Sequence, residues 1–293
     1  MDVIDDFVFS LEQSGEYSPT TVFFYRTHAE IILRLMERLG LNNDPKTISE
    51  TDIRTLVAYL QENNTSSTQR DYISALKKIC AYYGNDVFYK VKIRFPVDTR
   101  PNVDWLEYDE CKKILNTWMS PLQEIIVSLE LLHGLRKCEV IRLTLDDLHE
   151  DYMTVTGKGH SGGKVRSVPY HPDFKRSLDR WMEYRNSLVE SAYPLDQPRN
   201  LLVYLKGGKL VKYEQVKGTA IHRQIEDISM RSGVHFSSHT LRRTFGRELF
   251  RSGVSIEIIA TIYGHESTQV TMLYLGLNMD DMTDALNKMR LRF

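Results

Sequence analysis

Apolar residues recur at intervals of three and four positions through most of the first 90 residues, the spacing of helices that each bury one face. Start and stop signals support this pattern, because Ser18-Pro19 places an N-cap before a helix-starting proline and Gly40 and Gly84 follow apolar runs. We predict four helices: 2–13, 18–40, one from Ser49 or Thr51, and one from Ser66 or Ser67 to Gly84. No glycine or proline interrupts them, so a compact helical bundle is expected.

The pattern changes after this bundle. Residues 91–104 contain two prolines and mixed charges without a helical period, which is typical of an extended linker. Beyond it, two β-type runs, Tyr152–Thr156 and Lys164–Pro169, flank the segment GKGHSGG and predict a hairpin. A third such run is Leu201–Leu205. Helices are expected at 107–117, 121–133, 137–143, 172–190, 214–231, 239–252, 255–262, 267–275 and 279–290.

The sequence therefore predicts a mainly α protein with a small antiparallel β-sheet and two domains. The first is a four-helix domain at 1–90, and the second is an α+β domain at 105–293 whose tail, 278–293, forms a final helix. A chain of 293 residues is long enough for two domains with separate cores.

Composition narrows the class of protein. No stretch approaches the roughly 18 apolar residues that a membrane helix requires, and the acidic start MDVIDD is not typical of a signal peptide. Three widely spaced cysteines fit reduced thiols better than a disulfide framework or a zinc site. We expect a cytoplasmic protein without a membrane partner.

Charge is distributed unevenly along a chain whose net charge is −1. Residues 1–98 contain 11 Lys and Arg against 14 Asp and Glu, whereas residues 152–251 contain 18 against 9. The second domain is therefore strongly basic, which is compatible with a DNA-binding groove but also with an ordinary solvated face.

Four residues near the C-terminus combine chemical groups suited to a phosphodiester. His239 and Arg242 are three positions apart and can share one face of a helix. His265 follows a glycine, and Tyr274 comes nine residues later. Arginine binds phosphate oxygens in a fork, and a tyrosine oxygen can attack phosphorus. Taken singly, each of these residues is more often a packing or surface residue.

These segments resemble the active site of the tyrosine recombinases, the integrase and Xer family. HTLRRTF and YGHESTQVTMLY match that family's pattern at all four positions, and the resemblance covers nearly the whole chain. HGLRKCEVIRLTLDDL resembles the segment of the first catalytic arginine, Arg136, with Glu139 at the accompanying acidic position. TGKGHSGGKVRSVPY resembles the hairpin of the catalytic lysine, Lys158. The resemblance implies that the helical bundle is a core-binding (SAM-like) domain that clamps DNA.

The resemblance also implies roles for these residues. Arg136 and Arg242 would neutralise charge on the scissile phosphate, so that neither a metal nor another cofactor would be needed. Tyr274 would be the nucleophile, and His239 its proton acceptor. His265 would hydrogen-bond the phosphate or the nucleophile. Lys158 would protonate the leaving 5′-oxygen.

Some assignments remain open between alternatives. Lys164 and Arg166 are rivals of Lys158 for the role of general acid. Further contacts with DNA are expected from basic residues of both domains: Arg70, Lys77, Lys78, Lys164, Arg166 and Arg243.

The expected partner is double-stranded DNA with paired recombination half-sites. The resemblance implies a nucleoid-associated homo-tetramer on two DNA sites, assembled by exchange of the C-terminal helix, and a monomer in free solution. The apolar face of that helix, formed by Met279, Met282, Leu286 and Met289, could dock on its own domain or on a neighbour. Integration and dimer resolution are not separated by sequence, and a non-catalytic DNA-binding protein on a recombinase fold is the alternative.

Overall fold

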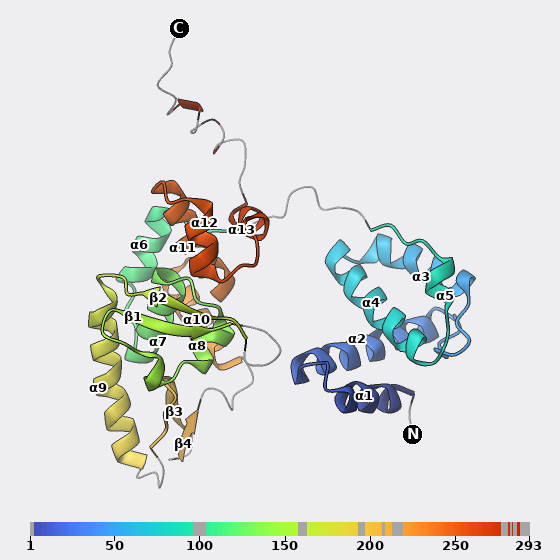
Figure 1. Ribbon diagram of the computed structural model, residues 1–293, viewed down its shortest axis with the longest axis horizontal. Coiled ribbons are helices and arrows are strands. Elements are labelled where there is room, and N and C mark those ends of the chain that lie inside the picture. The colour runs from blue at the N-terminus through green and yellow to red at the C-terminus, as the bar shows by residue number, and fades with distance from the viewer. Residues whose placement is uncertain are drawn as a thin grey trace. The chain divides into compact units, whose positions relative to one another are not determined.

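The protein consists of two compact units, Met1–Thr99 and Arg100–Phe293 (Figure 1). The computed structural model describes residues 3–95, 104–157, 163–192, 197–206, 209–212, 219–276, 281, 283, 286 and 287. Helices predominate in both units, and the described strands form two small antiparallel sheets. Among the described helices, none is long and apolar enough to cross a membrane.

The first unit contains the four predicted helices. Their bounds are α1 Val3–Ser14, α2 Pro19–Arg38, α3 Glu50–Asn63 and α4 Ser66–Tyr82. The expected caps are present, since the hydroxyl of Ser18 accepts from the backbone N–H of Thr21 at 3.2 Å and Ser49 forms a capping box with Asp52. The helices enclose one apolar core that includes Phe7, Ile32, Met36, Leu56, Leu76 and Ile79.

A short fifth helix, α5 (Val87–Lys90), was not predicted from the sequence. It follows Asn85, whose side-chain amide donates to the carbonyls of Pro45 and Ile48, both at 3.0 Å. The oxygen of the same amide accepts from the backbone N–H of Val87 at 3.1 Å. Residues 91–95 contain no helix or strand, and the remainder of the predicted linker, 96–103, lies outside the described residues.

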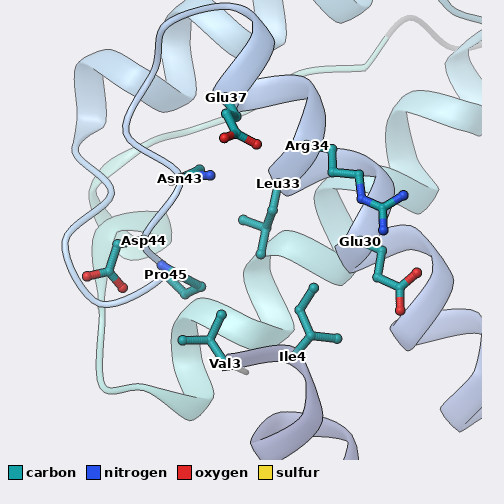
Figure 2. Close-up of a pocket in the computed structure, with 9 residues that line it drawn as sticks. All are labelled: Val3, Ile4, Glu30, Leu33, Arg34, Glu37, Asn43, Asp44 and Pro45. Atoms are coloured by element: carbon teal, nitrogen blue, oxygen red, sulfur yellow. The ribbon is translucent and has the colours of Figure 1, made fainter. Parts of the chain in front are cut away.

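A hollow of about 390 Å³ opens on the surface of the first unit, between α1, α2 and the loop after α2 (Figure 2). Its apolar floor includes Leu33 and Pro45, and its polar rim includes Glu37 and Asp44. None of the candidate catalytic residues lines this hollow, because all of them belong to the second unit.

The second unit is built from helices around a main apolar core, and a smaller apolar cluster is formed by Ile259, Tyr263 and Leu275. These helices are α6 Tyr108–Asn116, α7 Pro121–Val127, α8 Lys137–Arg142, α9 Phe174–Ala192, α10 Thr219–Ser232, α11 Ser238–Arg251, α12 Ile256–Tyr263 and α13 Thr268–Leu275. A 3₁₀ turn, Leu145–Asp147, follows α8. The largest buried apolar side chains include Trp181, Phe174 and Tyr263.

The predicted hairpin is formed by β1 (Tyr152–Thr156) and β2 (Val165–Pro169), and α12 packs against β2. Val155 pairs with Arg166 in its register. A second hairpin pairs β3 (Val203–Lys206) with β4 (Lys209–Lys212). The sequence predicted only the first strand of that pair, because β4 is short and basic.

The predicted helix 121–133 changes form along its length. After α7 it continues as a π-helix, Ser128–Leu132, and the backbone N–H of Leu135 reaches back to the carbonyl of Leu129 at 3.1 Å. The chain then turns at Gly134, whose φ is +63°. A Cβ at this position would lie 2.3 Å from the Phe245 ring and 2.9 Å from the Tyr263 ring. The glycine therefore permits both a left-handed turn and close packing of α11 and α12 immediately before Arg136.

Candidate active site

Arg136 stands at the N-cap of α8, where Glu139 fixes its backbone and its side chain. A Glu139 oxygen accepts from the Arg136 backbone N–H at 2.8 Å, and the other accepts from the guanidinium at 2.8 Å. The Glu139 side chain is fully buried, whereas 26% of the Arg136 side chain is exposed. The buried carboxylate therefore fixes Arg136 from the interior of the protein, and the exposed part of the guanidinium is accessible to a ligand.

Helix α11 supplies His239 and Arg242. Ser237 caps its start by accepting from the backbone N–H of Thr240 at 3.2 Å. Arg242 is buried and donates to the backbone carbonyls of Gly134 and Tyr263, the latter at 3.0 Å. Its guanidinium carbon also lies 4.2 Å from the centre of the Tyr263 ring. Burial, and then the charge of Arg136, lower the pKa of Arg242 to about 10, so it remains charged at neutral pH.

Backbone carbonyls at the C-terminal end of α12 accept hydrogen bonds from Arg136, Arg166 and Arg242. The carbonyl of Tyr263 accepts from Arg136 at 3.1 Å as well as from Arg242. The preceding carbonyl, that of Ile262, accepts from Nε of Arg166 at 2.7 Å. Carbonyls at a helix C-terminus carry partial negative charge, which favours cations there. The helix ends at Gly264, whose φ of +65° turns the chain toward His265.

His265 is held as a neutral imidazole. Nδ1 lies 2.9 Å from the hydroxyl of Thr271, and Nε2 lies 3.5 Å from the Arg242 guanidinium. A guanidinium can only donate, so Nδ1 carries the proton. Burial, followed by the charges of Arg242, Arg136 and Arg166, lowers the pKa of His265 to about 4.

Tyr274 lies on α13 beside this cluster. Its ring meets the rings of Tyr263 and His265 edge-on, with centroids 5.4 and 5.6 Å apart. The guanidinium carbons of Arg242 and Arg243 lie 5.8 and 5.4 Å from its centre. The Tyr274 hydroxyl is buried and has no hydrogen-bond partner of normal geometry among the described residues. Burial raises its pKa, and the nearby arginines oppose that rise only in part, so the hydroxyl is neutral in this arrangement.

A hollow of about 160 Å³ opens at this cluster. Arg136, His239 and Arg242 line it, together with Lys137, His222, Ser237 and Ser238. The structure thus brings the two arginines and His239 to one opening, and places His265 and Tyr274 against Arg242. Lys158 lies outside the described residues, so its position relative to the hollow is not defined.

The other predicted DNA contacts differ in their surroundings. Lys164 is exposed and lies 3.3 Å from Glu266, whereas the Arg166 side chain is only 9% exposed and faces Glu139. Arg166 is therefore directed into the protein, unlike the surface contact expected from sequence. In the first unit Lys77 is exposed, Arg70 lies over the Phe95 ring at 6.0 Å, and Lys78 over the Tyr17 ring at 5.0 Å.

The sequence-based interpretation missed one contributor to the site and did not foresee the direction of another. Tyr263 supports Arg242 with its ring and both arginines with its carbonyl, and no spacing signal in the sequence singles it out. The inward direction of Arg166 could have been inferred, because it is two residues before buried Val168 and alternate residues of a strand share a face.

Comparison with known proteins agrees with this geometry. Residues 104–281 match the family model described as the Phage integrase family. Tyrosine recombinase XerC of Oceanobacillus iheyensis is 27% identical over 97% of this chain and 94% of its own length. Tyrosine recombinase XerD of Listeria innocua is 24% identical over 93% of each chain.

Solved structures show the same fold. A lambda integrase fragment, residues 75–356, crystallised as a dimer on a COC' core site, has a TM-score of 0.68 at 17% identity and covers 99% of this chain and 98% of that one. XerA recombinase has a TM-score of 0.54 at 22% identity, with full coverage of both chains. The chain belongs to the Phage integrase family, the tyrosine recombinases. The predicted fold class and enzyme class, a site-specific recombinase, are confirmed.

The low pKa of His265 gives a testable expectation. Its folded-state pKa of about 4 lies below the ordinary 6.5, so the native state binds fewer protons than the unfolded chain between these values. The stability that this neutral imidazole contributes is present above pH 6.5 and is lost as the pH falls toward 4. Titration of the ¹⁵N-labelled imidazole by NMR should show a neutral Nδ1–H form at pH 6. A midpoint near 6.5 would contradict the described environment.

Proposed function

We propose that the second unit cleaves and rejoins DNA at specific sites, with Tyr274 as nucleophile and Arg136 and Arg242 as ligands of the scissile phosphate. The observation that carries the proposal is that both guanidiniums donate to one carbonyl, that of Tyr263, beside the ring of Tyr274. Two adjacent arginines can stabilise the charge that develops on the non-bridging oxygens of a five-coordinate phosphorus. DNA is accordingly the partner of this chain.

The reaction proceeds by exchange of phosphoesters. The Tyr274 oxygen forms a bond to phosphorus as the bond from phosphorus to the 5′-oxygen breaks, which leaves a 3′-phosphotyrosyl link and a 5′-hydroxyl. The tyrosine proton passes to His239, and Lys158 supplies a proton to the leaving oxygen. His265, whose Nδ1–H is directed at Thr271, offers Nε2 as an acceptor to the hydroxyl of the nucleophile. The 5′-hydroxyl of a partner strand then attacks the link and releases Tyr274, so no external source of energy is consumed.

The first unit contributes binding of the duplex in this proposal. Arg70, Lys77 and Lys78 lie on α4 and offer cations for DNA phosphates, while Lys164 and Arg243 do so in the second unit. Paired half-sites would each bind one protomer, and two such sites would assemble four protomers. The same chemistry serves integration, excision and dimer resolution, and the DNA sites and accessory proteins decide among them.

The tail has a described contact with its own unit. Asp281 forms a two-pronged ion pair with Arg247, at 2.6 and 2.8 Å, and both side chains are largely buried. Arg247 is held in turn over the Trp105 ring at 4.4 Å. We propose that the chain is anchored at Asp281 and that the segment beyond it docks on a neighbouring protomer on DNA, which would close a ring by a heterologous contact.

Replacement of Tyr274 by Phe tests the central assignment. Wild-type protein incubated with a nicked suicide substrate should form a covalent adduct that survives a denaturing gel, and Tyr274→Phe should form none. Tyr108→Phe, which alters a tyrosine that is 73% exposed, should form the adduct like wild type. An equal adduct from Tyr274→Phe would move the nucleophile elsewhere. Specific binding without any adduct from wild type would favour the non-catalytic alternative.

A substrate with sulfur at the leaving 5′-position tests the general acid. A thiolate departs without protonation, so this substrate should restore most of the cleavage that Lys158→Ala loses on ordinary DNA. Lys164→Ala should lose little on either substrate, because Lys164 is exposed and paired with Glu266. Rescue of Lys164→Ala and not of Lys158→Ala would assign the acid to Lys164.

Removal of residues 282–293 tests the role of the tail while keeping Asp281. The truncated protein should bind a single site normally, because the Arg247–Asp281 pair remains, but should fail to join two sites into one synaptic complex on a native gel. Tyr274→Phe in the full-length chain is the control, since it lacks the nucleophile but keeps the tail. Normal synapsis by the truncated protein would exclude docking in trans.

A further inference from the structure

The buried carboxylate of Glu139 lies close to three arginines, Arg136, Arg166 and Arg242. It binds Arg136 through the backbone N–H and the guanidinium, both at 2.8 Å, and it binds Arg166 through both of its oxygens. Arg242 is close but not hydrogen-bonded, with 3.6 Å between a guanidinium nitrogen and the nearer oxygen. Three positive groups therefore surround a single negative one at the centre of the site.

Arg166 makes the most complete pairing of the three. Its two terminal nitrogens donate to the two Glu139 oxygens at 3.0 and 2.8 Å, and Nε donates to the carbonyl of Ile262 at 2.7 Å. A Cβ on Gly264 would approach the Arg166 side chain to 3.2 Å, so the guanidinium also packs against the turn that leads to His265. Such a bidentate pair is strong and geometrically specific. The pair also fixes β2 against the end of α12.

The pairing decides how much positive charge is left for a phosphate. With Arg166 present, the cluster of three arginines and one carboxylate carries a net charge of +2. Without it, the net charge would be +1, and the Glu139 carboxylate, left with Arg136 as its hydrogen-bonded cation, would attract Arg136 and Arg242 more strongly. In a buried site such attraction is weakly screened. Glu139 must orient Arg136 without drawing Arg136 and Arg242 away from the phosphate. It can do so only if a further cation neutralises its charge.

We propose that Arg166 is a positioning residue for strand cleavage: it neutralises Glu139, so that Glu139 orients Arg136 while Arg136 and Arg242 stay available to the scissile phosphate. The inference rests on the proposed function, in which these two arginines bind that phosphate. It does not assign Arg166 a contact with DNA. All three of its guanidinium nitrogens already donate within the protein, two to Glu139 and Nε to the carbonyl of Ile262, so Arg166 is neither the general acid nor a phosphate contact in this proposal.

A double-mutant cycle on Arg166 and Glu139 tests this role. Arg166→Gln should slow adduct formation at saturating protein by roughly 10- to 100-fold, which lies within the range of coupling between residues of one ion-pair network. Affinity for the duplex should change by no more than about 3-fold, because Arg166 is not a DNA contact in this proposal. Introducing Arg166→Gln into a Glu139→Gln background should cost little further rate, since no carboxylate is left to neutralise.

Controls separate this role from a purely structural one. Arg199→Gln makes the same exchange in an exposed pair with Asp146 and should leave the rate unchanged. Thermal unfolding midpoints report whether each variant folds, and the double variant replaces a buried charged pair by a neutral one, which proteins tolerate better than loss of one partner. If Arg166→Gln alone does not fold, Arg166→Lys replaces it: a lysine keeps the charge that neutralises Glu139 but not the two-pronged contact, so the rate should stay near that of wild type, and a loss as large as that of Glu139→Gln overturns the proposal.

Wild-type adduct formation reports on the proposed function itself and is measured first. With that adduct present, an unchanged rate in Arg166→Gln overturns the proposal. So does an equal loss of rate from Arg166→Gln in the wild-type and Glu139→Gln backgrounds, because a residue that only stabilises the fold would give that result. A large loss of duplex affinity at an unchanged saturated rate would make Arg166 a DNA-binding residue instead.

Discussion

The active site depends on a carboxylate placed where no water reaches it. A buried ion is strongly disfavoured unless it is paired and hydrogen-bonded, and Glu139 meets this condition with donors from Arg136 and Arg166. Burial alone would raise the pKa of this carboxyl. The hydrogen bonds and charge of Arg166, followed by the backbone of Arg136 and the charge of Arg242, bring it below the ordinary value instead. Removing one partner would therefore affect the positions of all the others.

Two backbone carbonyls help the Glu139 carboxylate to position the same three arginines. The last turn of α12 presents the carbonyls of Ile262 and Tyr263 to three guanidiniums, and Gly264 then reverses the chain so that His265 faces the same cluster. A single helix end thus orients residues contributed by α8, β2 and α11. Elements far apart in sequence are thereby brought to one place in the fold.

Sequence predicted the parts of the structure that local signals determine. The helices of the first unit follow caps such as Ser18 and Ser49, and the hairpin follows its alternating pattern. The π-helix after α7 was not predictable, because no local residue pattern distinguishes it from a continued α-helix. Spacing and resemblance predicted Arg136, His239, Arg242, His265 and Tyr274 as site residues, and the structure places them in one cluster. The support from Tyr263 and the direction of Arg166 depend on packing between distant segments, which spacing does not encode.

The helix that carries Tyr274 buries little apolar surface. Of its eight residues only Thr271 and Leu275 are buried, whereas Val270, Met272 and Leu273 are exposed. Full burial of one leucine is worth about 1.5–3 kcal/mol, so separating α13 from the unit would cost little compared with disrupting the main core. In the proposed reaction, the nucleophile on such an element can be withdrawn or presented while Arg136 and Arg242 keep their contacts with the end of α12. Reactivity at this site can then be set by the position of one short helix, and two copies of the same chain can differ in activity without differing in fold.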